Sequence, residues 1–80
     1  MNVCRAVALR ISKLLSERQI TQYRLEQDSG ILHGTMMGIM TERNKNITLK
    51  TVMQIAKGFK MSLIKFLDDQ IFRDENLDIE

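Results

Sequence analysis

The segment at residues 20–40 constrains the fold of this 80-residue chain more than any other part of the sequence. Thr21 is a residue type that caps helix N-termini, and apolar residues recur after it at the spacing of one helix face. Gly30 interrupts the pattern where a helix can end in a left-handed backbone conformation, which glycine adopts without a Cβ clash. The pattern therefore predicts two short helices, over about 21–29 and 32–40, joined by a tight turn.

Two short helices joined in this way form a helix-turn-helix, whose second helix can enter the major groove of DNA. The charge distribution agrees with a nucleic-acid partner. Residues 1–67 carry eleven Lys and Arg against four Asp and Glu, whereas residues 68–80 carry one Arg against six acids. A basic body favours contact with phosphates. We expect the acidic end to be solvated, partly frayed and directed away from the duplex.

The remaining segments also follow helical periodicity, and no alternation typical of strands competes with it. Apolar residues at i+3 and i+4 predict a first helix over about 3–18. A polar loop over 42–47 precedes a fourth helix capped by Thr48, and Ser62 caps a fifth helix. The chain is therefore expected to be all-α with five helices.

We expect two regions along the chain. Residues 1–67 form the helix-turn-helix DNA-binding domain, and residues 68–80 contain the end of the fifth helix and the acidic tail. Eighty residues suffice for one domain with a small core.

Composition argues against several other classes of protein. No apolar run approaches the length that crosses a membrane, so we expect a cytoplasmic, nucleoid-associated protein without a membrane partner. With Cys4 and His33 as the only cysteine and histidine, a structural zinc site would lack ligands, and we expect neither metal nor cofactor. Ser29, His33 and Asp28 lack the spacing of a catalytic set, so we do not expect an enzyme.

The order and spacing of the five helices resemble the phage-repressor (Xre/Cro-type) helix-turn-helix family over residues 7–67. Two motifs carry the resemblance: ITQYRLEQDSGI at residues 20–31, and NITLKTVMQIAKGFKMSLIKFL at residues 46–67, which looks like the family's fourth and fifth helices. The resemblance implies a lambda-repressor-like fold. It also implies a homodimeric transcriptional regulator, a repressor or autoregulator, that binds an inverted-repeat operator in double-stranded DNA.

The resemblance also assigns contacts with DNA to particular residues. The positions that face base edges are Leu32, His33, Gly34, Met37 and Gly38. The positions that touch phosphates are Gln22, Thr35, Arg43, Asn44, Lys45 and Asn46. No base-facing residue is Arg, Lys, Gln or Asn, the usual donors to guanine and adenine. Since His33 is the one strong hydrogen-bonding group there, we expect modest direct readout and a larger contribution from phosphates and DNA shape. The alternative is that this helix is only a packed structural element, whose outward face no longer recognises bases.

Departures from the family pattern concern the core. The resemblance implies an Arg–Glu pair at positions that Leu15 and Met40 occupy here, and the apolar pair leaves no buried charge without a partner. Lys60 stands where the family usually has the glycine that ends the fourth helix. Because a left-handed lysine costs about 1 kcal/mol, we expect that corner to be differently shaped.

The fifth helix suggests how two chains meet. On helical spacing, Ile64, Ile71 and Phe72 are the best candidates for an apolar dimer interface. The alternatives are a fifth helix buried more completely by the tail, and an interface along the first helix.

The sequence is also compatible with two more specific functions. One is an antitoxin that binds its own promoter and masks a basic toxin with the acidic tail. The other is a controller protein of a restriction–modification system, to which RNKNITL at residues 43–49 looks similar. Phage repressors are similarly close, and RNA polymerase is a further partner to consider. A neighbouring toxin, endonuclease or integrase gene would distinguish the three.

Overall fold

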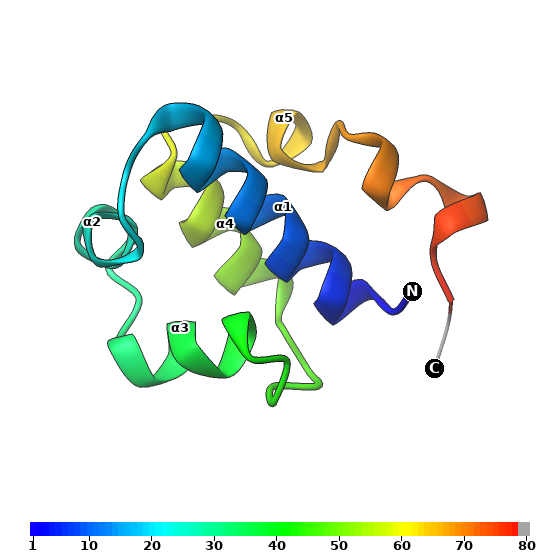
Figure 1. Ribbon diagram of the computed structural model, residues 1–80, viewed down its shortest axis with the longest axis horizontal. Coiled ribbons are helices and arrows are strands. Elements are labelled where there is room, and N and C mark those ends of the chain that lie inside the picture. The colour runs from blue at the N-terminus through cyan, green and yellow to red at the C-terminus, as the bar shows by residue number, and fades with distance from the viewer. Residues whose placement is uncertain (79–80) are drawn as a thin grey trace.

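The computed structural model describes residues 1–78, and within them it contains helices and turns but no strand (Figure 1). The helices are α1 (Val3–Arg18), α2 (Gln22–Ser29), α3 (His33–Met40), α4 (Leu49–Gly58) and α5 (Leu63–Leu67), followed by the 3-10 turns η1 (Gln70–Phe72) and η2 (Asp74–Asn76). The prediction of an all-α fold with five helices is confirmed. None of these helices is long and apolar enough to cross a membrane.

Side-chain caps explain where most of the helices begin. In α1, α2, α4 and α5 the residue before the helix accepts a hydrogen bond from a backbone amide of the first turn; these residues are Asn2, Thr21, Thr48 and Ser62. Each such cap stabilises a helix by about 1 kcal/mol. α3 follows Leu32, which has no side-chain acceptor. The position of α3 therefore depends on packing rather than on a cap.

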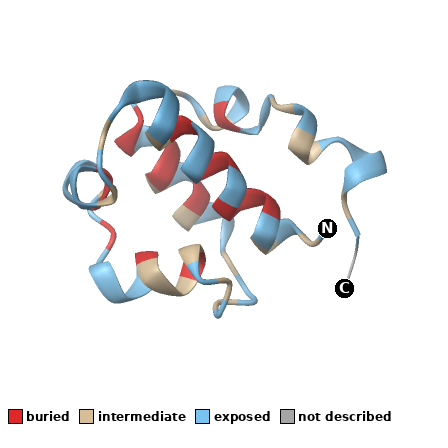
Figure 2. Ribbon diagram, viewed as in Figure 1, coloured by how far each residue is buried: buried red, intermediate tan, exposed pale blue. Residues whose placement is uncertain are grey.

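The core lies between α1 and α4 and is closed by the other helices (Figure 2). Its largest fully buried side chains come from all five α-helices and from the residue that follows α4: Val7, Ile11, Leu25, Met36, Ile39, Ile55, Phe59 and Phe66. Leu15 and Met40 are partly buried and pack against this core. The two apolar residues thus contribute to packing, and neither leaves a buried charge.

Gly58 allows α2 and α4 to approach closely. A Cβ built on Gly58 would lie 2.9 Å from Cδ1 of Leu25 and 2.9 Å from Cβ of Ser29. Because real Cβ atoms do not approach other atoms so closely, a larger residue here would push α2 away from α4.

Four residues of the described chain have left-handed backbone: Gln19, Gly30, Glu42 and Lys60. Gly30 ends α2 with φ 75°, as the sequence predicted. Lys60, which follows α4, has φ 60°. The expectation of a differently shaped corner is wrong, because the lysine itself adopts the left-handed conformation that glycine would take.

Sequence reasoning was also wrong about the C-terminal segment. α5 ends at Leu67 and does not continue beyond it. The side chain of Asp69 accepts a hydrogen bond from the Ile71 amide, at 2.9 Å, and this contact starts η1 in place of a further turn of α5. The fifth helix is consequently short, and the residues after it follow a different path.

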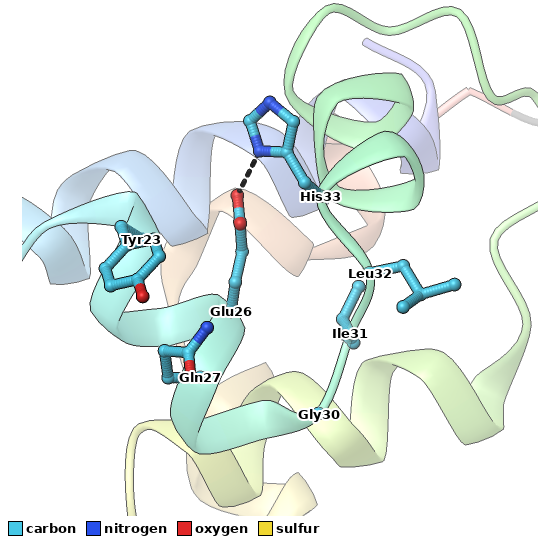
Figure 3. A pocket seen from close by; sticks show the side chains of 7 residues that line it. All are labelled: Tyr23, Glu26, Gln27, Gly30, Ile31, Leu32 and His33. Atoms are coloured by element: carbon cyan, nitrogen blue, oxygen red, sulfur yellow. Dashed lines mark hydrogen bonds and ion pairs between the residues drawn. The ribbon is translucent and has the colours of Figure 1, made fainter.

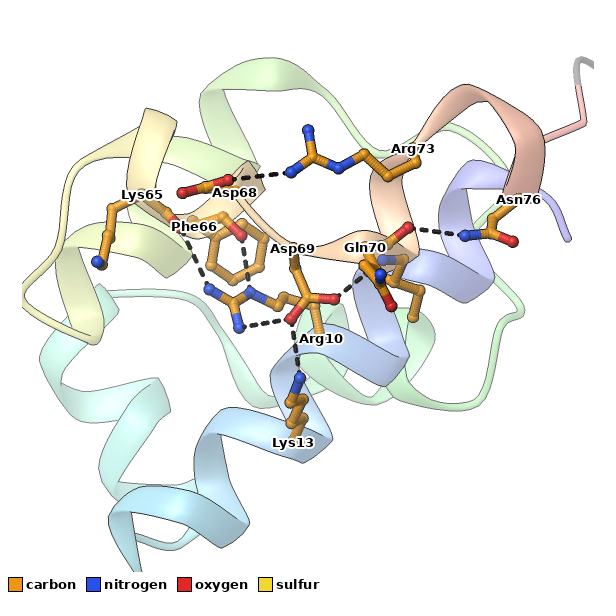
Figure 4. Close-up of polar contacts among 10 residues, drawn as sticks. Arg10, Lys13, Lys65, Phe66, Asp68, Asp69, Gln70, Arg73 and Asn76 are labelled. Atoms are coloured by element: carbon orange, nitrogen blue, oxygen red, sulfur yellow. Dashed lines mark hydrogen bonds and ion pairs between the residues drawn. The ribbon is translucent and has the colours of Figure 1, made fainter.

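Arg10 holds this segment against α1 (Figure 4). Its side chain is buried, and its guanidinium donates to the carbonyl oxygens of Phe66 (2.7 Å) and Lys65 (3.2 Å) and to Oδ2 of Asp69 (3.2 Å). Lys13 donates to the same carboxylate oxygen at 3.0 Å. Arg10 therefore supplies a donor to the Phe66 carbonyl, for which no backbone amide at the end of α5 is a partner, and a second donor to the Lys65 carbonyl, which also accepts from the Asp68 amide.

The described part of the acidic tail is folded onto the body, contrary to expectation. Cations of the same chain contact two of its carboxylates: Asp69 contacts Arg10 and Lys13, and Asp78 lies 3.0 Å from the N-terminal ammonium. The Asp78 amide also donates to the carbonyl of Met1, forming an isolated bridge beside the start of α1. The last two residues, 79–80, lie outside the described part, and so does the expectation made for them.

Candidate DNA-binding surface

The turn between α2 and α3 is anchored on one side and open on the other. Residues 30–32 join the two helices. Ile31 is buried in the core, whereas the next residue, Leu32, is 77% exposed. Met36 and Ile39 bury the inner face of α3. The opposite face of α3 is therefore held outward by a fixed turn and two core side chains.

The five residues predicted to face bases do not all lie in the open. Leu32, His33 and Gly34 are exposed, whereas Met37 and Gly38 are half-buried. The loop after α3 folds back over Gly38, since the Asn44 amide donates to the Gly38 carbonyl at 2.9 Å. A Cβ built on Gly38 would lie 3.7 Å from Cβ of Asn44. The accessible part of the predicted reading face is consequently the first turn of α3.

A hydrogen-bonded chain of side chains joins α2 to that first turn, and Figure 3 shows its contact between Glu26 and His33. Glu26 is buried, and its Oε2 accepts from Nε2 of Gln22 at 3.0 Å and lies 2.9 Å from Nδ1 of His33. Nε2 of Gln22 also approaches the sulfur of Met37 at 3.3 Å. The hydrogen bond from Gln22, and then the one from His33, lower the pKa of the Glu26 carboxyl. Glu26 is therefore ionised at neutral pH.

Sequence reasoning missed Glu26. The available signal was its position one turn after Gln22 and next to the apolar Leu25, which places it at the edge of the inner face of α2. The contact with His33 could not be predicted because it depends on the angle between α2 and α3.

A hollow of about 410 Å³ opens beside this chain, between α2 and the start of α3 (Figure 3). It is lined by Tyr23, Glu26, Gln27, Gly30, Ile31, Leu32 and His33. His33 and Leu32 thus stand at its rim, where a groove-binding surface would present them.

The residues predicted to touch phosphates fall into two groups. Thr35, Arg43, Lys45 and Asn46 are exposed, whereas Gln22 and Asn44 are half-buried. The side chain of Asn44 accepts from the Asn46 amide at 2.9 Å, so it shapes the loop. In the free protein the Gln22 amide is directed to Glu26. The four exposed residues can therefore contact phosphates without any rearrangement of the free protein.

The residues predicted to form a dimer interface do not lie on one helix. Ile64 on α5 is 81% exposed, the largest exposure among the large apolar side chains of the described chain. Ile71 and Phe72 lie half-buried in η1, because α5 ends before them. The Phe72 ring packs against the core, with its centroid 6.1 Å from that of Phe66. The helical alignment of these residues was therefore wrong, and the tail covers more of this region than expected.

Comparison with known protein families agrees with this arrangement. A model of the Cro/C1-type HTH DNA-binding domain matches residues 10–68, which include α2, α3, α4, α5 and most of α1. The chain belongs to this family, and its fold is lambda-repressor-like, so the resemblance found in the sequence is confirmed. The chain is a DNA-binding protein of the transcription-regulator class. Comparisons with curated proteins and with solved structures gave no match.

Proposed function

We propose that this protein is a homodimeric transcriptional regulator, a repressor or autoregulator, that binds an inverted-repeat operator through the first turn of α3. The observation that carries the proposal is the exposure of Leu32, His33 and Gly34 on a helix whose other face is fixed in the core. An outward helix on a fixed turn is the geometry that places side chains at base edges in the major groove.

Phosphate contacts would flank this reading turn. Thr35 on α3 and Arg43, Lys45 and Asn46 in the following loop are exposed. Gln22, at the N-terminal end of α2, would join them, since helix N-termini attract phosphate through free amides and the helix dipole. Such contacts give most of the affinity but little of the specificity. With few base donors on α3, selectivity would depend strongly on DNA shape.

A two-fold dimer would bring two copies of α3 to successive major grooves. Ile64 supports such a dimer, because an apolar side chain this exposed is stabilised when a partner covers it. α5 and α3 lie at opposite edges of the molecule in Figure 1, so a contact at Ile64 would leave α3 free. Ile71 and Phe72 contribute less to this proposal than the sequence suggested, since both are half-buried within one chain.

The internal ion pairs of the tail reduce the number of carboxylates open to the antitoxin alternative. Masking a basic toxin requires free carboxylates. Asp69 and Asp78 contact cations of their own chain, whereas Asp74 and Glu75 are exposed without an ion pair among the described residues. Asp68 also lies 3.5 Å from Arg73. A controller protein of a restriction–modification system differs from other regulators in its target and gene context rather than in this surface.

Selection of bound sites from random double-stranded DNA tests the proposal. We expect enrichment of an inverted repeat with half-site centres about one helical turn apart. Failure to enrich any sequence, together with absence of binding at low salt, would contradict DNA regulation. A single unpaired half-site would contradict the dimer.

Matched lysine variants test the phosphate contacts. Lys45→Ala should weaken binding to all sequences alike and reduce the steepness of the salt dependence. Lys65→Ala removes the same charge from α5, away from α3, and should change the affinity much less. Equal effects of the two variants would mean that net charge, rather than a local contact, determines the affinity.

A further inference from the structure

The contact between His33 and Glu26 makes the two ring nitrogens of the histidine unlike. Nδ1 lies 2.9 Å from Oε2 of Glu26, whereas the second ring nitrogen points away from Glu26 (Figure 3). The His33 side chain is 71% exposed, and the Glu26 side chain is 7% exposed. One end of the imidazole is thus held by a buried group, and the other end is free to meet a ligand.

Glu26 determines which nitrogen carries the hydrogen. Its carboxyl is fixed by the hydrogen bond from Gln22, and its lowered pKa keeps it ionised at neutral pH. An ionised carboxylate can only accept hydrogen bonds, so Nδ1 must donate. Nε2 is then a bare acceptor while the imidazole is neutral, and it becomes an N–H donor when the imidazole is protonated.

We propose that Glu26 is a positioning residue that holds His33 in its Nδ1–H form and thereby determines which base edges Nε2 can recognise. This inference rests on the proposed function, in which the first turn of α3 faces the major groove. A bare Nε2 accepts from the amino group of cytosine or adenine, whereas a protonated Nε2 donates to guanine or to O4 of thymine. The preferred base should therefore differ between the neutral and the protonated imidazole, and so should change with pH.

The groups around the imidazole support this assignment. The hollow beside His33 is lined by two titratable groups of α2, Glu26 and Tyr23. α1 also packs against α3, but its Arg5 pairs with Glu42, which follows the C-terminal end of α3. Within the described chain, Glu26 is therefore the charged group that faces the imidazole of His33.

Nitrogen NMR of the free protein tests the hydrogen position without DNA. His33 is the only histidine, so its two ring nitrogens give the only imidazole signals. At alkaline pH, with the imidazole neutral, we expect hydrogen on Nδ1 in the wild type. In Glu26→Gln the amide can either accept from or donate to Nδ1, so a mixture of the two forms should appear. Hydrogen on Nε2 in the wild type, or an unchanged form in Glu26→Gln, would overturn the proposal.

Asp28→Asn is the matched control. Asp28 is also on α2, and its replacement by asparagine also removes one negative charge. Its carboxylate contacts Arg24 at 2.9 Å and not His33. Any general gain in attraction to phosphate is thus common to both variants. Asp28→Asn should keep the wild-type form of His33.

Binding to four duplexes that differ at the base pair sensitive to His33→Ala tests the consequence. Between about pH 5.5 and about pH 8, the wild type should change its preference between amino-bearing and acceptor-bearing bases by about tenfold. Glu26→Gln should show a smaller change, because its neutral imidazole can present Nε2 either bare or with hydrogen, and Asp28→Asn should retain the full change. An identical pH-dependent preference in Glu26→Gln would refute the positioning role. If no duplex is bound at all, the proposed function fails, whereas the NMR result still decides the state of His33.

Discussion

Replacing Arg10 by methionine should destabilise the fold by about 2–4 kcal/mol. The magnitude follows from what the guanidinium contacts. Its bond to the Phe66 carbonyl is buried, and a buried acceptor left without a donor costs about 1–3 kcal/mol. The bonds to Lys65 and Asp69 are partly buried, so water can replace them, and their loss adds about 1 kcal/mol together. Methionine fills a similar apolar volume, which limits any cavity.

Such a loss would be a large fraction of the total. At about 0.05–0.15 kcal/mol per residue, a domain of this size has a free energy of unfolding of roughly 4–12 kcal/mol. Urea unfolding at neutral pH, followed by circular dichroism, would measure the difference through the midpoint and the slope. Hydrogen exchange should also become faster in the segment that Arg10 holds, residues 68–78.

Lys13→Met is the control for the Arg10 experiment. Lys13 contacts the same oxygen of Asp69, but its side chain is 54% exposed. An exposed ion pair contributes about 0.2–1 kcal/mol. If Arg10→Met costs no more than Lys13→Met, Arg10 does not hold the C-terminal segment, and the account of that segment is wrong.

Three further predictions test other parts of the structure. Gly58→Ala should destabilise the fold by about 1–3 kcal/mol, because its Cβ would collide with α2. The open Gly34 should instead accept alanine with a gain of up to about 1 kcal/mol, and thermal melting would compare the two variants. Glu26 and Asp69 have lowered pKa values in the folded state, and for Asp69 the main causes are the hydrogen bonds from the Ile71 amide and Lys13. Both carboxylates therefore add to the free energy of unfolding at neutral pH, and this contribution is lost as pH falls below about 4. Asp69→Asn should lower the stability at pH 7 and reduce its fall in acid, as measured by urea midpoints across pH. Ile64→Asp should give a folded monomer in analytical ultracentrifugation that binds the full operator without cooperativity, whereas a surviving dimer would place the interface elsewhere.

The sequence predicted those parts of the fold that depend on local signals. Caps such as Thr48 and Ser62, and the glycine that ends α2, mark helix ends through contacts within a few residues. Helical periodicity then identified the core faces, including those of α3. These elements could be predicted because their causes lie close together in the chain.

The errors concern contacts between distant residues. Arg10 lies on the inward row of α1 between Ala6 and Leu14, yet its partners are more than fifty residues away. Periodicity alone could therefore not show that α5 stops at Leu67. The tail appeared solvated because its charge was considered without the cations it contacts, of which Lys13 is one.

In the candidate site, too, features with local causes could be predicted and features that depend on distant contacts could not. Exposure of Leu32 and His33 follows from their place at the start of α3. The covering of Gly38 depends on the path of the loop after α3, and the bond between Glu26 and His33 depends on how α2 crosses α3. Neither is encoded in the spacing of residues within one helix.

We propose that DNA is bound by the first turn of α3 and the segments beside it. Amide chemical-shift mapping with the selected operator duplex tests this claim most directly. We expect the largest changes at the start of α2, at residues 32–35 and in the loop at residues 41–46, with small changes at η1 and η2. Changes confined to α5 and the C-terminal turns, with α3 unaffected, would contradict the account.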